Sequence, residues 1–136
     1  MNFTSHHIAI SAANLQESIN FYEEFGFKLV LQHDDPEGAF KIAHLKLDTT
    51  FLEIFWYRDR IPAPETAAAL STDLPRVGVK HFGLRVDSVY DAKKFVESRG
   101  LATNVQIKEG KTGITYFFLK DPSGILVEVL EDKRGL

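Results

Sequence analysis

The 136-residue sequence contains no cysteine, a single methionine and no long uninterrupted apolar run. Without cysteine there can be no disulfide framework, no thiolate metal site and no cysteine nucleophile, so a metal ion would need imidazole and carboxylate ligands. No segment approaches the roughly 18 apolar residues of a membrane-spanning helix. The N-terminus also lacks the basic stretch and apolar run of a signal peptide. We therefore expect a cytoplasmic protein with no membrane partner.

The overall composition is that of an ordinary globular protein. Hydrophobic residues make up 44% and charged residues 26% of the chain, which is enough apolar material for a core that folds without staples. The net charge of −3 gives no excess of basic residues that would attract nucleic acid. We expect one domain spanning residues 1–136, with a small molecule rather than a polymer as its ligand.

The second half of the sequence repeats the pattern of the first. Residues 6–27 align with residues 80–101, and the strands that follow align as well. Equivalent positions in the two halves are His7 and His81, Gly26 and Gly100, and Glu53 and Glu128. The repeat predicts a first module at about 4–58, a linker at 59–77 and a second module at about 78–132.

Each half has the pattern of a βαβββ unit. Alternating apolar residues and turn signals predict strands at 5–11, 27–33, 39–47 and 51–57, and at 80–86, 103–108, 113–120 and 125–130. Helices are predicted at 15–25 and 89–99, where Asn14 and Ser88 are suited to cap the N-termini and a glycine follows each C-terminus. The linker is predicted to contain a short helix at 65–70. These patterns indicate an α+β fold.

Two glutamates stand within otherwise apolar strands, Glu53 in FLEIF and Glu128 in ILVEVL. Buried carboxylates are uncommon unless they are paired or bind metal. The first strand of each half supplies a histidine, His7 or His81, so each module offers one imidazole and one carboxylate. If the modules pack about a pseudo-twofold axis, the four side chains meet on one divalent Zn, Ni, Mn or Fe ion. The alternative, that these side chains have no shared metal-binding role, requires two unrelated coincidences at equivalent positions of the repeat. The other histidines, His6, His33 and His44, are expected to be solvated or capped.

Further side chains are candidates for substrate binding because strand alternation places them on the same faces as the predicted ligands. They are Ser11, Phe55, Tyr57 and Arg85, together with Lys111 on the predicted loop at 109–113. Arg85 is suited to contact an anion, although an arginine at a strand end can equally extend into solvent.

At these residues the chain resembles the vicinal-oxygen-chelate superfamily, which includes glyoxalase I, methylmalonyl-CoA epimerase, extradiol dioxygenases, and fosfomycin- and bleomycin-resistance proteins. The resemblance covers almost the whole chain and rests on His7, NLQESINFYEEFGFKL, Glu53 in LEIF, His81 in KHFGLRV, and DPSGILVEVLE. It implies two βαβββ modules forming an eight-stranded half-open mixed sheet around one metal ion, and a homodimer. The His-Glu-His-Glu set is closest to that of glyoxalase I.

The resemblance to glyoxalase I implies a lyase that works through an enediolate, with Glu128 as the catalytic base and Glu53 as its partner. The chain departs from that enzyme at two glutathione-contacting positions, where Ser11 and Tyr57 replace the usual arginine and asparagine. The alternatives are therefore another metal-dependent epimerase or dioxygenase of the superfamily, or a protein that binds a small molecule without chemistry.

Overall fold

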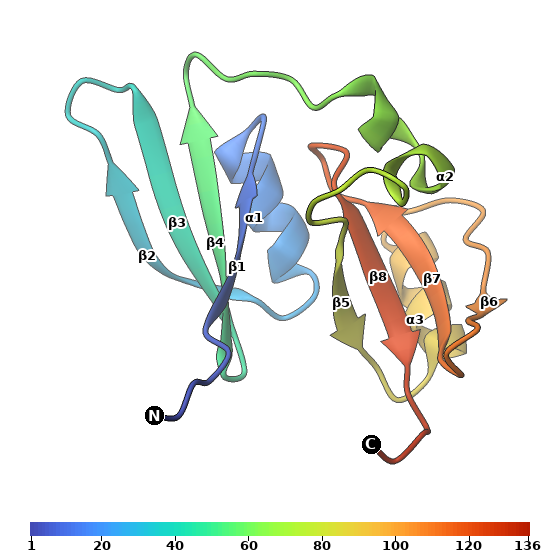
Figure 1. Cartoon of the computed structure of the whole chain (residues 1–136). Helices are drawn as coiled ribbons and strands as arrows, with labels where there is room; N and C mark the ends of the chain where they lie inside the picture. The colour runs from blue at the N-terminus through green and yellow to red at the C-terminus, as the bar shows by residue number, and fades with distance from the viewer. The chain divides into compact units, whose positions relative to one another are not determined.

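A computed structural model describes all residues, 1–136, as two compact units, Met1–Pro64 and Glu65–Leu136 (Figure 1). Each unit contains one four-stranded mixed sheet and one longer helix. The predicted α+β fold with two βαβββ modules is therefore confirmed. We refer to the two units as module 1 and module 2.

Module 1 follows the predicted order of elements closely. Its elements are β1 (His7–Ser11), α1 (Leu15–Glu23), β2 (Lys28–Asp34), β3 (Phe40–Leu47) and β4 (Thr50–Tyr57). The sheet order is β1-β4-β3-β2, with β1 parallel to β4 and the other neighbours antiparallel. The outer strand β1 therefore lies directly beside the last strand of the module, which brings the predicted histidine strand next to the predicted glutamate strand.

Module 2 has the same topology, preceded by two short helical turns. Its elements are the 3₁₀ helix η1 (Glu65–Ala68), α2 (Leu70–Asp73), β5 (Phe82–Arg85), α3 (Val89–Ser98), β6 (Lys108–Glu109), β7 (Thr115–Lys120) and β8 (Leu126–Glu131). The sheet order is β5-β8-β7-β6, with β5 parallel to β8. The single helix predicted at 65–70 is thus two separate turns. None of the helices has the length and apolar character needed to cross a membrane.

The ends of α1 and α3 are fixed by the residues predicted to do so. The Asn14 side chain accepts a hydrogen bond from the Glu17 amide at 3.1 Å, and the Ser88 hydroxyl accepts one from the Asp91 amide at 3.2 Å. Each bond satisfies one of the amides that a helix start leaves without a partner. The glycine after each helix has a positive φ, which any other residue adopts at a cost. Equivalent local signals therefore start and stop both helices.

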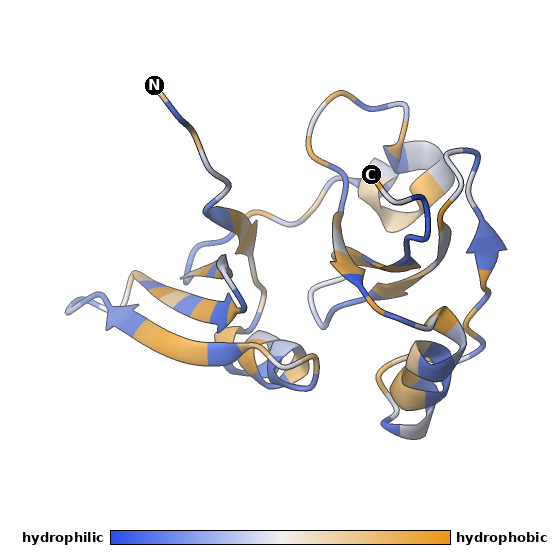
Figure 2. Ribbon diagram, turned by 90° about the horizontal axis from the view of Figure 1, so that it is seen from below, coloured by the Kyte–Doolittle hydropathy of each residue, from blue (hydrophilic) through white to orange (hydrophobic).

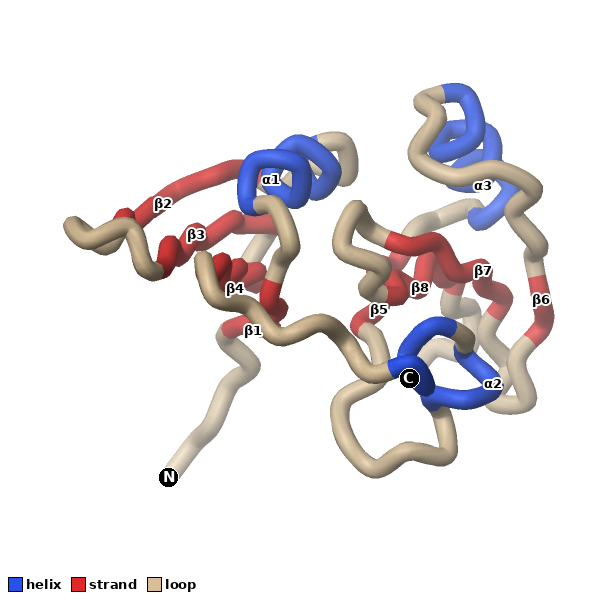
Figure 3. Tube along the Cα trace, turned by 90° about the horizontal axis from the view of Figure 1, so that it is seen from above, coloured by secondary structure: helices blue, strands red, loops and turns tan.

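Each helix covers only one face of its sheet, as Figure 3 shows for α1 and α3. The side chains on that face form the core; in the strands they include Ala43, Leu45, Leu52 and Ile54 in module 1 and Phe117, Leu119, Val127 and Val129 in module 2. Figure 2 shows the resulting alternation of hydrophobic and hydrophilic positions along the strands. Glu53 and Glu128 each lie between two of these buried residues in sequence, so strand alternation directs them to the face that the helix leaves open.

The predicted strand at 103–108 is wrong over most of its length, because only Lys108–Glu109 pairs with β7. The Val105 amide donates to a carboxylate oxygen of Glu97 on α3 at 3.0 Å, and Asn104 has a φ of 53°. A side-chain acceptor and a left-handed residue replace the ladder hydrogen bonds there. The resulting loop borders a hollow of about 470 Å³ whose other wall includes Tyr116 and Phe118 of β7.

Candidate metal and substrate site

In module 1 the strand register brings His7 and Glu53 together. Residues His7 to Ser11 pair with Phe51 to Phe55 in parallel, so β1 and β4 present their alternate side chains on the same face. The Nε2 atom of His7 lies 3.7 Å from Oε2 of Glu53. The glutamate side chain is 22% exposed and the histidine 47%, which leaves this pair accessible from the open face of the sheet.

Module 2 contains the equivalent pair. His81 stands just before β5, and its Nε2 atom lies 3.3 Å from Oε2 of Glu128 on β8. Gly83 pairs with Glu128 across the two strands, and a Cβ atom at Gly83 would stand 2.9 Å from the Leu130 side chain and 3.8 Å from the Glu128 carboxylate. The absence of a side chain at Gly83 therefore makes room for the Leu130 side chain next to the Glu128 carboxylate. The repeat in the sequence has become a repeat of two imidazole–carboxylate pairs.

These pairs have the spacing of two ligands on one ion. Nitrogen and oxygen ligands at 2.0–2.2 Å from a metal are separated by about 2.8–3.6 Å in tetrahedral or right-angled arrangements. The 3.3 Å of the His81 pair falls within that range and the 3.7 Å of the His7 pair lies close to it. The donor set therefore fits a divalent transition metal.

Each pair alone is an incomplete site. The chain contains no group of three histidine, cysteine or acidic side chains arranged to hold a metal ion. The convergence of His7, Glu53, His81 and Glu128 on one ion therefore remains a prediction, which is taken up below.

Two of the histidines expected to be solvated or capped contact predicted ligands: His6 is exposed to solvent as expected, whereas His44 is partly buried against Glu53. The Nδ1 atoms of His6 and His7 are 3.0 Å apart, and the His6 ring stacks on Phe51 with centroids 5.0 Å apart. His44 on β3 lies opposite Glu53 on β4, with its Nε2 atom 2.8 Å from Oε1 of the glutamate. The tight turn at residues 48 and 49 is the sequence signal that could have found the His44 contact, because it sets the register of the β3–β4 hairpin.

A pocket of about 220 Å³ opens beside the His81–Glu128 pair. Its lining consists of Leu70, Leu74, His81, Gly110, Lys111, Thr112, Ile114, Tyr116, Phe118 and Glu128. Among the predicted substrate-binding residues, only Lys111 lines this pocket, together with the predicted metal ligands His81 and Glu128. The remaining surface is largely apolar, so the pocket combines one cation with one imidazole–carboxylate pair on a hydrophobic wall.

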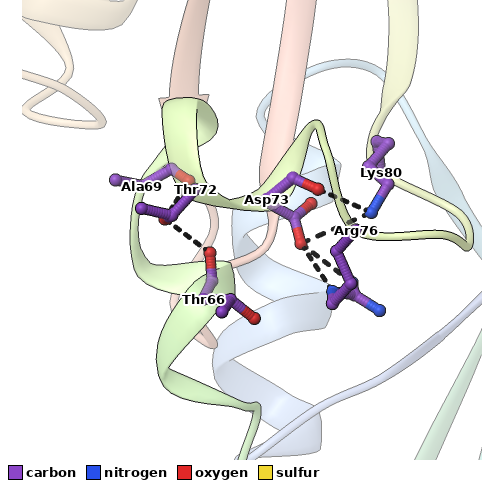
Figure 4. A network of polar contacts seen from close by, with 6 residues as sticks. All are labelled: Thr66, Ala69, Thr72, Asp73, Arg76 and Lys80. Atoms are coloured by element: carbon purple, nitrogen blue, oxygen red, sulfur yellow. Dashed lines mark hydrogen bonds and ion pairs between the residues drawn. The ribbon is translucent and has the colours of Figure 1, made fainter.

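The α2 segment that supplies Leu70 and Leu74 lies on the opposite side of the module 2 sheet from α3 (Figure 3). The buried Asp73 carboxylate accepts hydrogen bonds from Arg76 at 2.8 and 3.0 Å, and Lys80 donates to the Asp73 carbonyl at 2.8 Å (Figure 4). The Lys120 ammonium donates to the Ala68 carbonyl at 2.7 Å. These bonds tie the segment to the start of β5 and the end of β7, so this wall of the pocket is held in place.

The Asp73 network predicts a pH dependence of stability. Hydrogen bonding from Arg76 is the main cause of a lowered pKa for Asp73; desolvation opposes it, while the charges of Arg76 and Lys80 add to it. Because the unfolded chain then binds the proton more readily, stability is present above about pH 4 and is lost as pH falls through the lowered folded pKa. Asp73→Asn should lower the urea midpoint at pH 7 and flatten its decline below pH 4. An unchanged acid dependence would show that the network does not contribute.

The other predicted substrate-binding residues are placed as follows. Ser11 pairs with Phe55 across β1 and β4, two residues along β4 from Glu53. Tyr57 ends β4, is 47% exposed and lies against Phe40, with ring centroids 5.8 Å apart. The Arg85 guanidinium donates to the Asp132 carbonyl at 3.2 Å, which directs it toward the C-terminal segment. None of these four lines the pocket beside His81 and Glu128.

The arrangement of two βαβββ units agrees with a comparison of the sequence with protein-family models. Residues 4–129 match the glyoxalase/bleomycin resistance protein/dioxygenase superfamily. The chain belongs to this superfamily. The match covers both modules and includes all four predicted metal ligands, so the resemblance drawn from the motifs is confirmed at the level of the family.

Individual relatives of this superfamily member are more distant. It is 32% identical to the mitochondrial methylmalonyl-CoA epimerase of Dictyostelium discoideum, over 93% of this chain and 76% of that protein. It is 27% identical to the lactoylglutathione lyase of Schizosaccharomyces pombe, over 97% of this chain but only 46% of the lyase. A glyoxalase family protein from Enterococcus faecalis has the same fold, with a TM-score of 0.76, 28% identity, and coverage of 94% and 97% of the two chains.

Proposed function

We propose that this chain is a metal-dependent lyase or isomerase that removes the proton next to a carbonyl group and returns it at a neighbouring or the same carbon. The observation that supports this proposal is the repeated imidazole–carboxylate pair, His7 with Glu53 and His81 with Glu128, at the spacing of two ligands on one ion. The two half-sites are proposed to bind the same ion, in one chain or across a homodimer. A single pair would leave the ion with too few protein ligands for tight binding.

The residues of the chain have distinct parts in the proposed reaction. A bound divalent ion would supply Lewis-acid stabilisation of the negative charge that develops on the carbonyl oxygen. Glu128, at the pocket of module 2, takes the proton on its carboxylate and returns it, as a positioned general base and acid does. Lys111 on the pocket rim is suited to bind an anionic part of the substrate, and Phe118 and Tyr116 cover the apolar part.

Two substrate classes share this chemistry. Lactoylglutathione lyase and methylmalonyl-CoA epimerase are both among the relatives. Each name contains an acyl thioester, lactoylglutathione or methylmalonyl-CoA, in which a hydrogen is attached to the carbon next to the carbonyl. The replacement of the usual glutathione-contacting residues by Ser11 and Tyr57 favours a substrate other than the glutathione adduct. The apolar pocket with one cationic side chain, Lys111, favours an acyl group that carries a negative charge.

The proposal is tested by metal content and proton exchange measured together. Protein purified without chelator should contain close to one transition-metal ion per chain. In heavy water, the metal-loaded protein should catalyse deuterium incorporation into both kinds of substrate. The rate should be higher for an acyl thioester such as methylmalonyl-CoA, at the carbon next to the carbonyl, than for the methylglyoxal–glutathione adduct. If the protein still contains no metal after reconstitution with Zn²⁺, Ni²⁺, Mn²⁺ and Fe²⁺, the proposed metal site is refuted. If deuterium enters neither substrate, the proposed reaction class is refuted.

A further inference from the structure

The two glutamates of the proposed site have different surroundings. Glu53 on β4 lies opposite His44 on β3, and the imidazole Nε2 atom is 2.8 Å from Oε1 of the carboxylate. An ionised carboxylate only accepts hydrogen bonds, so the imidazole N–H is the donor. The other oxygen of Glu53, Oε2, is the one that faces His7. The two oxygens of this carboxylate therefore contact different histidines, Oε1 contacting His44 and Oε2 facing His7.

Module 2 has no such partner at the equivalent place. The residue opposite Glu128 on the neighbouring strand is Phe118, whose ring meets the His81 ring edge-on with centroids 4.8 Å apart. The only ion pair of Glu128 is the one with His81. The repeat thus places a hydrogen-bond donor beside one glutamate and a phenyl ring beside the other, at equivalent positions of the two hairpins.

We propose that His44 is a positioning residue that fixes Glu53 as a metal ligand, and that its absence from module 2 leaves Glu128 free to move a proton. This inference rests on the proposed function, because it assigns different tasks to the two carboxylates of that site. A carboxylate with Oε1 bound by an imidazole has already lost the rotation that metal binding would otherwise freeze, and it presents one oxygen in a fixed direction. Glu128, as the proposed base, would have to turn toward the substrate proton, and a fixed hydrogen bond to its carboxylate would oppose that movement.

The test is a titration of metal-free protein with Co²⁺, whose visible spectrum reports binding and ligand geometry without any substrate. His44→Phe gives module 1 the residue that stands at the equivalent place in module 2. It should weaken Co²⁺ binding about 10- to 100-fold, the usual cost of removing an outer hydrogen-bond partner of a ligand. His44→Gln, which keeps an N–H donor, should recover most of the affinity and the spectrum of the unsubstituted protein. Circular dichroism should show both variants folded.

The reverse exchange tests the other half of the inference. Phe118→His places an imidazole opposite Glu128 and should slow proton exchange at least 10-fold while Co²⁺ binds no more weakly. Unchanged affinity in His44→Phe, or equal losses in His44→Phe and His44→Gln, would overturn the positioning role of His44. Unchanged exchange in Phe118→His would overturn the freedom assigned to Glu128. If the unsubstituted protein binds no Co²⁺ at all, the proposed metal site fails first and this inference fails with it.

Discussion

Glu128→Gln is expected to slow exchange of the substrate proton by about 10²- to 10⁴-fold, the contribution that a positioned general base makes to a proton transfer. Glutamine has nearly the same shape but cannot accept the proton, and its amide oxygen can still approach a metal ion. Since Glu128 is only partly buried beside an open pocket, the substitution should leave the urea midpoint of metal-free protein close to its original value. The measurement is deuterium incorporation in heavy water at saturating metal.

Glu53→Gln is the matched control for this prediction, because Glu53 occupies the same place in module 1. If His44 holds Glu53 as a metal ligand, Glu53→Gln should weaken metal binding and should slow proton exchange mainly because less metal is bound. Excess metal should then restore part of the exchange rate. Equal and unrestorable losses in the two variants would contradict the assignment of Glu128 as the base. A rate in Glu128→Gln within threefold of the unsubstituted protein would remove Glu128 from the reaction altogether.

The sequence contained enough information for most of the fold, and the reason is local. Helix caps such as Asn14 and Ser88 and the alternation of apolar residues in β4 and β8 act within a few residues, so their signal survives without tertiary context. The histidine–glutamate pairs were also predictable, because a repeat makes two weak patterns reinforce each other. Parallel pairing of the first strand with the last in each module then brings His7 to Glu53 and His81 to Glu128.

The missed features all depend on contacts between segments. The strand predicted at 103–108 was lost because Glu97, on a helix, takes the Val105 amide. His44 was set aside as solvated because its role follows from the register across a hairpin and not from its neighbours in sequence. The wall of the pocket formed by Leu70 and Leu74 lies in a region that the sequence indicates as a linker with a short helix. The Asp73 hydrogen bonds that hold it against module 2 are not visible as a sequence pattern.

His81→Ala should weaken metal binding by more than about 100-fold, since removing a ligand costs more than removing a ligand's outer partner. His7→Ala should do the same, although it alters the other module. If the two half-sites bind one ion, the unsubstituted protein binds one metal per chain and each variant binds almost none under the same conditions. If each half-site bound its own ion, the unsubstituted protein would bind two and each variant would retain one. Metal content after gel filtration distinguishes these results directly.

Mixing the two variants then identifies which chains supply a site. If both modules of a site come from the same chain, every site in the mixture of His7→Ala and His81→Ala lacks one histidine, and metal binding stays lost. If module 1 of one chain joins module 2 of its partner, a mixed dimer contains one site with both substitutions and one with neither. Random pairing makes half of the dimers mixed, so about a quarter of the original metal content and exchange activity should return after subunits are exchanged. Recovery requires that His7 and His81 bind the same ion, which makes this result the strongest support the proposed four-ligand site could receive.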